Sequence, residues 1–220
     1  MTFALLAYRL VGMLTERRPK PRTAGSGRDP ERTRRRLLDA GFEEVYRRGY
    51  QSTDLDTVLE KAGVTKGALY YHFENKEALG HAIIEEVIGT ITREKWLTPL
   101  RSGNPIDALI QIVQSTSTDA PEVRGGCPFN NLAQEMSGLD EGFRKRLAKI
   151  LTDWRDTMAE SFHRGQGEGT VRKNIDPEDE ATFFIALYEG YISLAKNSQD
   201  AKLLKSGKKR MIHHLESLRT

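Results

Sequence analysis

The segment from Thr53 to Phe73, reading TDLDTVLEKAGVTKGALYYHF, constrains the fold more than any other part of the chain. Its first apolar residues recur at i, i+3, i+4 and i+7, which places them on one face of a helix: Leu55, Val58, Leu59 and Ala62. Thr53 is the expected N-cap, Gly63 allows a tight turn, and a second short helix is expected to start at Thr65. The segment therefore predicts two short helices joined by a turn.

Within the second helix, Leu69 and Phe73 share the inward face and leave a mixed polar and aromatic surface outside. That surface consists of Thr65, Lys66, Gly67, Ala68, Tyr70, Tyr71 and His72. Small residues allow close approach to base edges, while a cation, two phenols and an imidazole can reach phosphates. The alternative is that Tyr70 and Tyr71 are packing residues of a plain helical hairpin.

Gly49, Thr53, the run AGVTKGALYYHF and the following Asn75-Lys76-Glu77 and Leu79 closely resemble the N-terminal signature of the TetR/AcrR family of transcriptional regulators. The resemblance implies an all-α fold, with an N-terminal three-helix helix-turn-helix DNA-binding domain and a C-terminal helical ligand-binding and dimerisation domain. It implies a repressor that leaves a palindromic operator when a small-molecule or thiol-reactive effector binds. Leu59 departs from the alanine that many members carry.

The resemblance also assigns roles to individual residues. It places Thr65, Lys66 and Ala68 at the base-facing start of the second helix, with Gly67 permitting close approach. It places Tyr70, Tyr71 and His72 beside the groove. Thr53 and Lys76 resemble phosphate contacts near helix N-termini, and their alternative roles are capping and solvation.

Three regions are expected: a basic, flexible arm over residues 1–30, the DNA-binding domain over 31–78, and the regulatory and dimerisation domain over 79–220. The 220 residues are 38% hydrophobic and 30% charged, which is enough for one medium domain and a small one. Residues 1–36 hold ten Lys or Arg and three Asp or Glu, so the arm would add affinity for double-stranded DNA that depends on salt. A disordered solubilising tail is the alternative for residues 17–30.

Residues 1–14 are apolar, but they lack a basic leading region and a small-residue cleavage pattern, and they are too short to span a bilayer. We interpret them either as a flexible extension or as the result of a start codon assigned too far upstream. In the second case Met13 is the initiator and residues 1–12 do not belong to the native protein. No membrane segment is expected. The single cysteine agrees with a cytoplasmic location.

Helices dominate the remaining pattern. Asn75 is expected to cap a long helix with a buried stripe of Leu79, Ile83, Ile84, Val87, Ile88 and Ile91. Further helices are expected over 105–118, over 128–137 and through Phe143 to Phe162. Asp176-Pro177 is a strong helix start.

The last two helices are expected to form a homodimer interface. Residues 181–188 are apolar apart from Thr182, so this helix must be covered on more than one side. The final helix carries one apolar stripe: Leu204, Met211, Leu215 and Leu218. A four-helix interface would hold two reading helices about 34 Å apart, which matches a palindrome.

The candidates for effector sensing are Cys127, Trp96, Phe129, Trp154 and Tyr188. Core packing is the alternative role of the four aromatic residues. Cys127 precedes Pro128 at a predicted helix N-terminus, where amide donors and the helix dipole are expected to lower the pKa of its thiol. The segment GCPFNNLAQE also resembles a branch of the family in which some members sense oxidants or electrophiles through this cysteine. The alternative is an inert, small apolar residue.

A small enzyme and a helical protein-interaction module without DNA binding are the competing classes. The five histidines are the obvious catalytic material, and we find no metal spacing with a carboxylate, no nucleophile elbow and no phosphate-binding glycine loop. We therefore expect no catalytic residue, no metal site and no cofactor.

Overall fold

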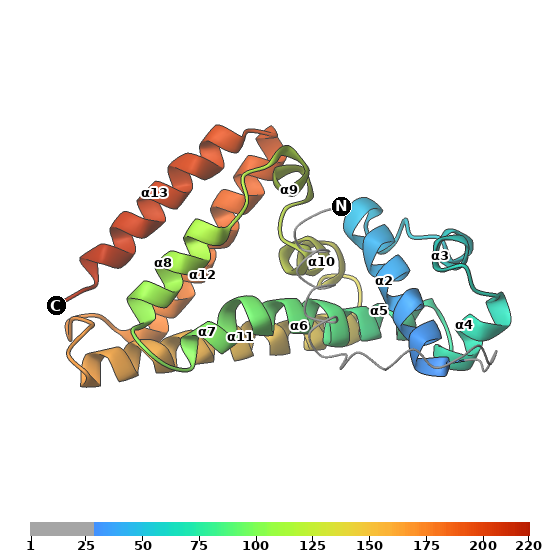
Figure 1. The fold of residues 1–220 in the computed structure, drawn as a ribbon, viewed down its shortest axis with the longest axis horizontal. Coiled ribbons are helices and arrows are strands. Elements are labelled where there is room, and N and C mark those ends of the chain that lie inside the picture. The colour runs from blue at the N-terminus through green and yellow to red at the C-terminus, as the bar shows by residue number, and fades with distance from the viewer. Residues whose placement is uncertain (1–28) are drawn as a thin grey trace, which may run out of the picture. The chain divides into compact units, whose positions relative to one another are not determined.

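The computed structural model describes residues 29–220, and every regular element in this range is a helix (Figure 1). The predicted all-α class is confirmed. The predicted arm lies outside the described residues apart from Asp29 and Pro30. The chain divides into two compact units: unit 1 comprises residues 29–90 and 131–146, and unit 2 comprises Ile91–Asn130 and Leu147–Thr220. The predicted boundary between residues 78 and 79 stays a prediction.

Unit 1 is built on α2 (Pro30–Arg48), which packs against α3 (Leu55–Ala62), α4 (Lys66–His72), α5 (Lys76–Ala82) and η1 (Ile83–Ile88). Asp29 caps α2 by accepting a hydrogen bond from the Arg32 amide, and proline occupies the first turn. The core between these helices is formed by fully buried apolar side chains, among them Leu37, Phe42, Val58, Leu69 and Ile83.

The helix caps in unit 1 confirm most of the predicted boundaries. Gly63 ends α3 with a φ of 59°, a conformation that glycine adopts without strain, and Thr65 caps α4. Thr53 does not cap α3, so that prediction is wrong. The cap is Asp54, whose carboxylate accepts from the Asp56 amide. Both residues are good caps, and burial of Thr53 leaves the position to its neighbour.

The predicted long helix after Asn75 is a continuous helical run over residues 76–100. It consists of α5, η1, α6 (Gly89–Thr92), η2 (Arg93–Leu97) and α7 (Thr98–Leu100). The η segments are π-helical: the Gly89 amide donates to the Ile84 carbonyl, and the Thr98 amide donates to the Arg93 carbonyl. Each of these bonds spans five residues instead of four, a feature frequent at functional sites.

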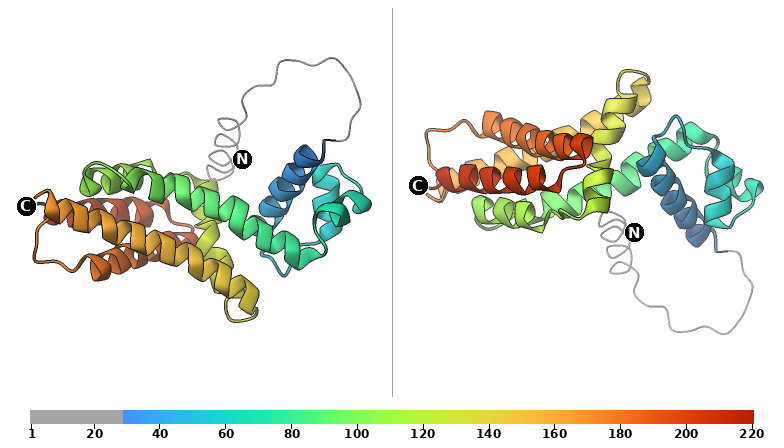
Figure 2. Two further views of the ribbon diagram at one scale, coloured as in Figure 1. Left: turned by 90° about the horizontal axis from the view of Figure 1, so that it is seen from below. Right: turned by 90° about the horizontal axis from the view of Figure 1, so that it is seen from above.

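Unit 2 is a helical bundle. It contains α8 (Pro105–Ser115) and α9 (Ala120–Gly125), most of α11 (Glu141–Gly167), and α12 (Pro177–Ser198) and α13 (Ala201–Ser217). α10 (Pro128–Met136) and α11 each contribute residues to both units. α13 packs against α12 and α8, and Figure 2 shows α12 and α13 side by side. In the described part of the chain, no helix is long and apolar enough to cross a membrane.

The apolar stripe of α13 does not face a partner. Leu204, Met211, Leu215 and Leu218 are at most 2% exposed within the single chain, so their assignment to a dimer interface is wrong. The periodicity showed that something covers this stripe, and the chain's own helices do so. The apolar residues left exposed lie on α12 instead, where Phe183 is 49% and Leu194 is 56% exposed.

Candidate nucleic-acid interface and effector cluster

The outward face of α4 is open to solvent. Tyr71 is 76% and Tyr70 is 48% exposed, so neither is a packing residue of unit 1. Thr65, Lys66 and Gly67 are exposed as well. Leu69 and Phe73, at 1% and 3% exposure, anchor the opposite face as predicted. The helix is thus held by one side, and the other presents a cation and two phenols.

Two details of α4 bear on close approach to a groove. The Ala68 amide donates to the Thr65 hydroxyl, which fixes the first turn. A Cβ added to Gly67 would meet no atom of residues 29–220 within 4 Å. The packing of unit 1 therefore does not require glycine at position 67. A DNA groove that approaches the helix closely would require it. His72 is half-buried, with its ring edge-on to Tyr71 at 4.9 Å.

Thr53 and Lys76 have internal partners. The Thr53 side chain is buried, and its hydroxyl donates to the Gly49 carbonyl at 2.7 Å. Lys76 Nζ donates to the Gln51 carbonyl at 3.0 Å and lies 4.9 Å from the centroid of the Tyr50 ring. Their predicted phosphate contacts stay predictions, and the geometry gives both a role in holding the turn between α2 and α3.

The same turn depends on a residue that the sequence did not single out. The amides of Tyr50 and Gln51 donate to the two carboxylate oxygens of Glu135, at 2.9 and 2.8 Å. Gly49 has a φ of 87°, and a Cβ there would lie 3.0 Å from that carboxylate. Glu135 is 84 residues from Gln51, so no local pattern could have revealed this contact.

The four aromatic candidates for sensing converge in unit 2. The ring of Trp96 lies 4.6 Å from that of Trp154 and 4.7 Å from that of Tyr188, and Phe129 lies edge-on to Trp154 at 6.2 Å. All four are buried. Their role in sensing stays a prediction, because such packing equally serves a core.

Charged and polar groups lie against these rings. Lys95 Nζ donates to the Tyr188 hydroxyl at 2.6 Å, and the Tyr188 oxygen is 3.1 Å from the Thr116 hydroxyl. Burial lowers the pKa of Lys95, but the interactions with Tyr188, Cys127 and Glu189 together outweigh it, so the pKa is raised and the amine is charged. Trp154 Nε1 is buried without a hydrogen-bond partner. The cluster therefore combines packed aromatic rings with one fixed cation, Lys95, and one unsatisfied hydrogen-bond donor, Trp154 Nε1.

Glu189, which follows Tyr188, was also missed. The residue is 8% exposed, and within the described chain no hydrogen bond of normal geometry reaches its carboxylate, although the Cys127 side chain lies close enough to interact with it. Burial raises the pKa of this carboxyl to about 7, against the opposing effects of Cys127 and Lys95. A carboxylate that directly follows an apolar run, here residues 183–188, is costly to bury, and that was the available signal.

Cys127 immediately precedes Pro128, the first residue of α10, as predicted. The predicted low thiol pKa is wrong. Burial raises the pKa of Cys127 well above its ordinary value, and the charge of Glu189 raises it further. The Asn130 amide, which hydrogen-bonds the sulfur, and Lys95 act in the opposite direction without compensating. The group is therefore a thiol at neutral pH.

Comparison with known proteins agrees with this architecture. Residues 37–83 match the bacterial regulatory proteins of the tetR family, and residues 105–211 match the tetracyclin repressor-like C-terminal domain. The chain is 31% identical over 190 residues to the transcriptional regulator AcuR of Cereibacter sphaeroides, an alignment that covers 82% of each protein. It is 37% identical over 174 residues to the HTH-type transcriptional regulator TtgR of Pseudomonas putida, which covers 74% of this chain and 80% of TtgR.

A solved structure has the same fold. The crystal structure of the reduced form of NemR from Escherichia coli aligns with a TM-score of 0.72 and 25% sequence identity, covering 86% of this chain and 97% of that one. The matched residues include α4 and the helices that carry Phe129, Trp154 and Tyr188. The chain therefore belongs to the tetR family of bacterial regulatory proteins and is a DNA-binding transcriptional regulator.

Proposed function

We propose that this regulator is a homodimer that occupies a palindromic operator with two copies of α4 and represses transcription until an effector binds in unit 2. The exposed face of α4, with Tyr71 76% accessible beside Lys66, is the observation that carries the proposal. The reading residues are Thr65, Lys66, Gly67, Ala68, Tyr70, Tyr71 and His72. The proposal assigns the chain no catalytic reaction, and it places the chain in the cytoplasm, where bacterial operator DNA lies.

The dimer interface that we propose is formed by α12, with the exposed side of α13 at its edge. Phe183 and Leu194 are large apolar side chains that the single chain leaves about half exposed, and both lie on α12. Gly190 lies between them, and a Cβ added there would meet nothing within 4 Å, so a partner helix can approach closely. Two α4 helices held about one turn of DNA apart then match the two halves of a palindrome.

The effector site that we propose is the cluster around Trp96, Trp154 and Tyr188, with Cys127 and Phe129 beside it. The buried carboxylate of Glu189, which no described group reaches with a hydrogen bond of normal geometry, favours an effector that combines an apolar body with an N–H or O–H donor. Such an effector releases the operator only if it binds the released conformation more tightly than the DNA-bound one.

Selection from a randomised double-stranded DNA library tests the reading function. The enriched sequences should be inverted repeats whose half-site centres lie about 10 base pairs, or a multiple of that, apart. Enrichment of single, asymmetric sites would contradict a symmetric dimer on the operator. A library that yields no enriched sequence would overturn the proposed specificity.

The same experiment with Leu194→Glu tests the interface. A carboxylate in an apolar contact, present twice in a symmetric dimer, should weaken dimerisation by about 100-fold or more and remove the preference for inverted repeats. Leu151→Glu is the matched control, because Leu151 is an exposed leucine on α11 (42%) outside the proposed interface. Light scattering should show a monomer for the first variant and a dimer for the second.

A thiol-reactive effector makes a separate prediction. Because the pKa of Cys127 is raised, release of the operator by N-ethylmaleimide should be slow at pH 7 and accelerate about tenfold per pH unit up to that pKa. Cys127→Ser should bind the operator normally and resist release, and Cys127 is the only cysteine in the chain. Release of the Cys127→Ser variant at the parent rate would exclude the thiol as sensor.

A further inference from the structure

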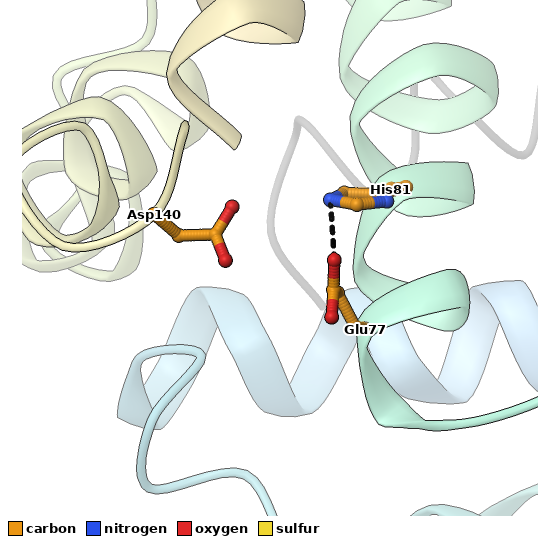
Figure 3. Close-up of side chains that lie close together, drawn as sticks. All are labelled: Glu77, His81 and Asp140. Carbon is orange, nitrogen blue, oxygen red and sulfur yellow. Dashed lines mark ion pairs between the residues drawn. The ribbon is translucent and has the colours of Figure 1, made fainter. Parts of the chain in front are cut away.

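Three potential metal ligands meet in unit 1, away from α4. Glu77 and His81 are one turn apart on α5, and Asp140 lies just before α11 (Figure 3). One ligand atom from each of them lies within 4.8 Å of the other two. Figure 3 shows the Asp140 carboxylate facing the His81 ring and the Glu77 carboxylate. The expectation that no histidine has metal spacing to a carboxylate is wrong at His81, four residues after Glu77.

From this geometry we propose that Glu77, His81 and Asp140 form a binding site for a divalent transition-metal ion, which clamps α5 to the start of α11. One imidazole nitrogen and two carboxylate oxygens suit Zn²⁺ and related ions, with water in the remaining position. In a tetrahedral Zn²⁺ site, ligand atoms about 2.0 to 2.1 Å from the metal lie about 3.4 Å apart. His81 Nε2 is 3.7 Å from Glu77 Oε1, so this pair needs little adjustment.

The donor atoms are free to bind. His81 Nε2 is buried and has no hydrogen-bond partner among the residues that the structure describes. The Phe143 amide donates to Asp140 Oδ1 at 2.9 Å, which holds the carboxylate in place and leaves Oδ2 for a cation. Burial and the nearby Arg146 lower the pKa of His81, which favours the neutral imidazole.

The surrounding packing brings the ligands together, and only glycine is compatible with it at position 142. A Cβ added to Gly142 would lie 2.9 Å from His81 Nε2 and 3.1 Å from Asp140 Oδ1, so glycine leaves room at the donor atoms. A Cβ added to Gly80 would lie 2.6 Å from the ring of Phe143, which shows how closely α5 approaches α11. Arg146, the nearby cation, is engaged by Glu85 at 2.9 Å and by the Gly142 carbonyl at 3.1 Å.

The carboxylates of the site also act on a neighbouring residue, Tyr50. The Tyr50 ring packs against Phe143 with centroids 4.5 Å apart. Burial raises the pKa of Tyr50 to about 12, and the charges of Glu77, Asp140 and Glu135 contribute to the rise. A bound divalent cation would offset this accumulation of negative charge.

Calorimetric titration of the full chain with Zn²⁺, after removal of metal by EDTA, tests the site. One ion per chain should bind with micromolar or tighter affinity, and zinc at a hundredfold excess over the dissociation constant should raise Tm by about 5 °C or more. Glu77→Gln, an isosteric change at an exposed position, should weaken binding tenfold or more and reduce the shift in Tm. Asp140→Asn, which retains a side-chain oxygen to cap α11, should do the same.

His81→Ala should abolish binding, and circular dichroism should show that the variant is folded. His163→Ala is the matched control, because His163 and Glu178 form an exposed pair at 2.9 Å that has no third ligand in the described chain. This control should bind zinc as the parent does. Absence of zinc binding to the parent at millimolar concentration, or parental affinity in Glu77→Gln and His81→Ala, would overturn the proposal.

Discussion

Tyr71→Ala is expected to weaken operator binding by about tenfold or more while the free energy of unfolding stays within about 0.5 kcal/mol of the parent. The side chain is 76% exposed, so its removal leaves little unsatisfied contact inside unit 1. A symmetric dimer carries the change twice, which multiplies its effect on affinity. Tyr71→Phe separates the contribution of the hydroxyl to DNA affinity from that of the ring, since it removes the hydroxyl and keeps the ring.

Lys66→Ala should weaken binding to all sequences and lower the salt dependence, because each phosphate contact contributes about one unit of slope and a dimer has two copies. Lys173→Ala removes the same charge from an exposed position between α11 and α12, outside the proposed interface, and is the control. Electrophoretic mobility shifts over a salt series, together with urea unfolding, measure both quantities. If Tyr71→Ala and Lys66→Ala both bind the operator with parental affinity, α4 is not the surface that reads DNA.

Glu189→Gln is expected to change how stability depends on pH. The pKa of Glu189 is raised from 4.5 to about 7 in the folded chain, so the folded state holds its proton more tightly than the unfolded state. Its contribution is fully present below about pH 4.5 and is lost as the pH rises through 7. The loss over this window is at most about 3 kcal/mol, and a glutamine does not titrate.

Urea unfolding of parent and Glu189→Gln at pH 5, 6, 7 and 8 isolates this contribution. The difference in free energy of unfolding between the variant and the parent should increase with pH by up to about 3 kcal/mol. Glu160→Gln, on the exposed side of α11, controls for the loss of a negative charge. A constant difference across the series would show that this carboxyl ionises as readily in the folded as in the unfolded chain.

The reading helix was predictable because its signals are local. Spacing placed Leu69 and Phe73 inside and left Tyr71 outside, and both assignments are confirmed. The N-cap of α3 was wrong by one residue, since Thr53 and Asp54 are both good caps and only burial separates them. The helical spacing of apolar residues likewise predicted a long helix after Asn75, but it did not predict the two π-helical segments within that helix.

The errors in the regulatory region have a common physical origin. The predicted low pKa of Cys127 rested on its position at a helix N-terminus, whereas burial and Glu189, far along the chain, determine the actual direction. The α13 stripe showed that Leu204 and Met211 are covered, but not which helix covers them. Whether a group is buried, and beside which charge, depends on residues distant in sequence.

The sequence by itself determined the helical class, the turn between the reading helices and the surface of α4, since helix periodicity and turns depend on residues within a few positions. Only the tertiary structure decided that Glu189 is buried beside Cys127 and Lys95 and that Glu135 holds the α2–α3 turn. It alone brought Asp140 to His81, 59 positions apart in the chain. Burial, charge pairing and ligand geometry arise when distant segments pack, and no local pattern encodes that packing.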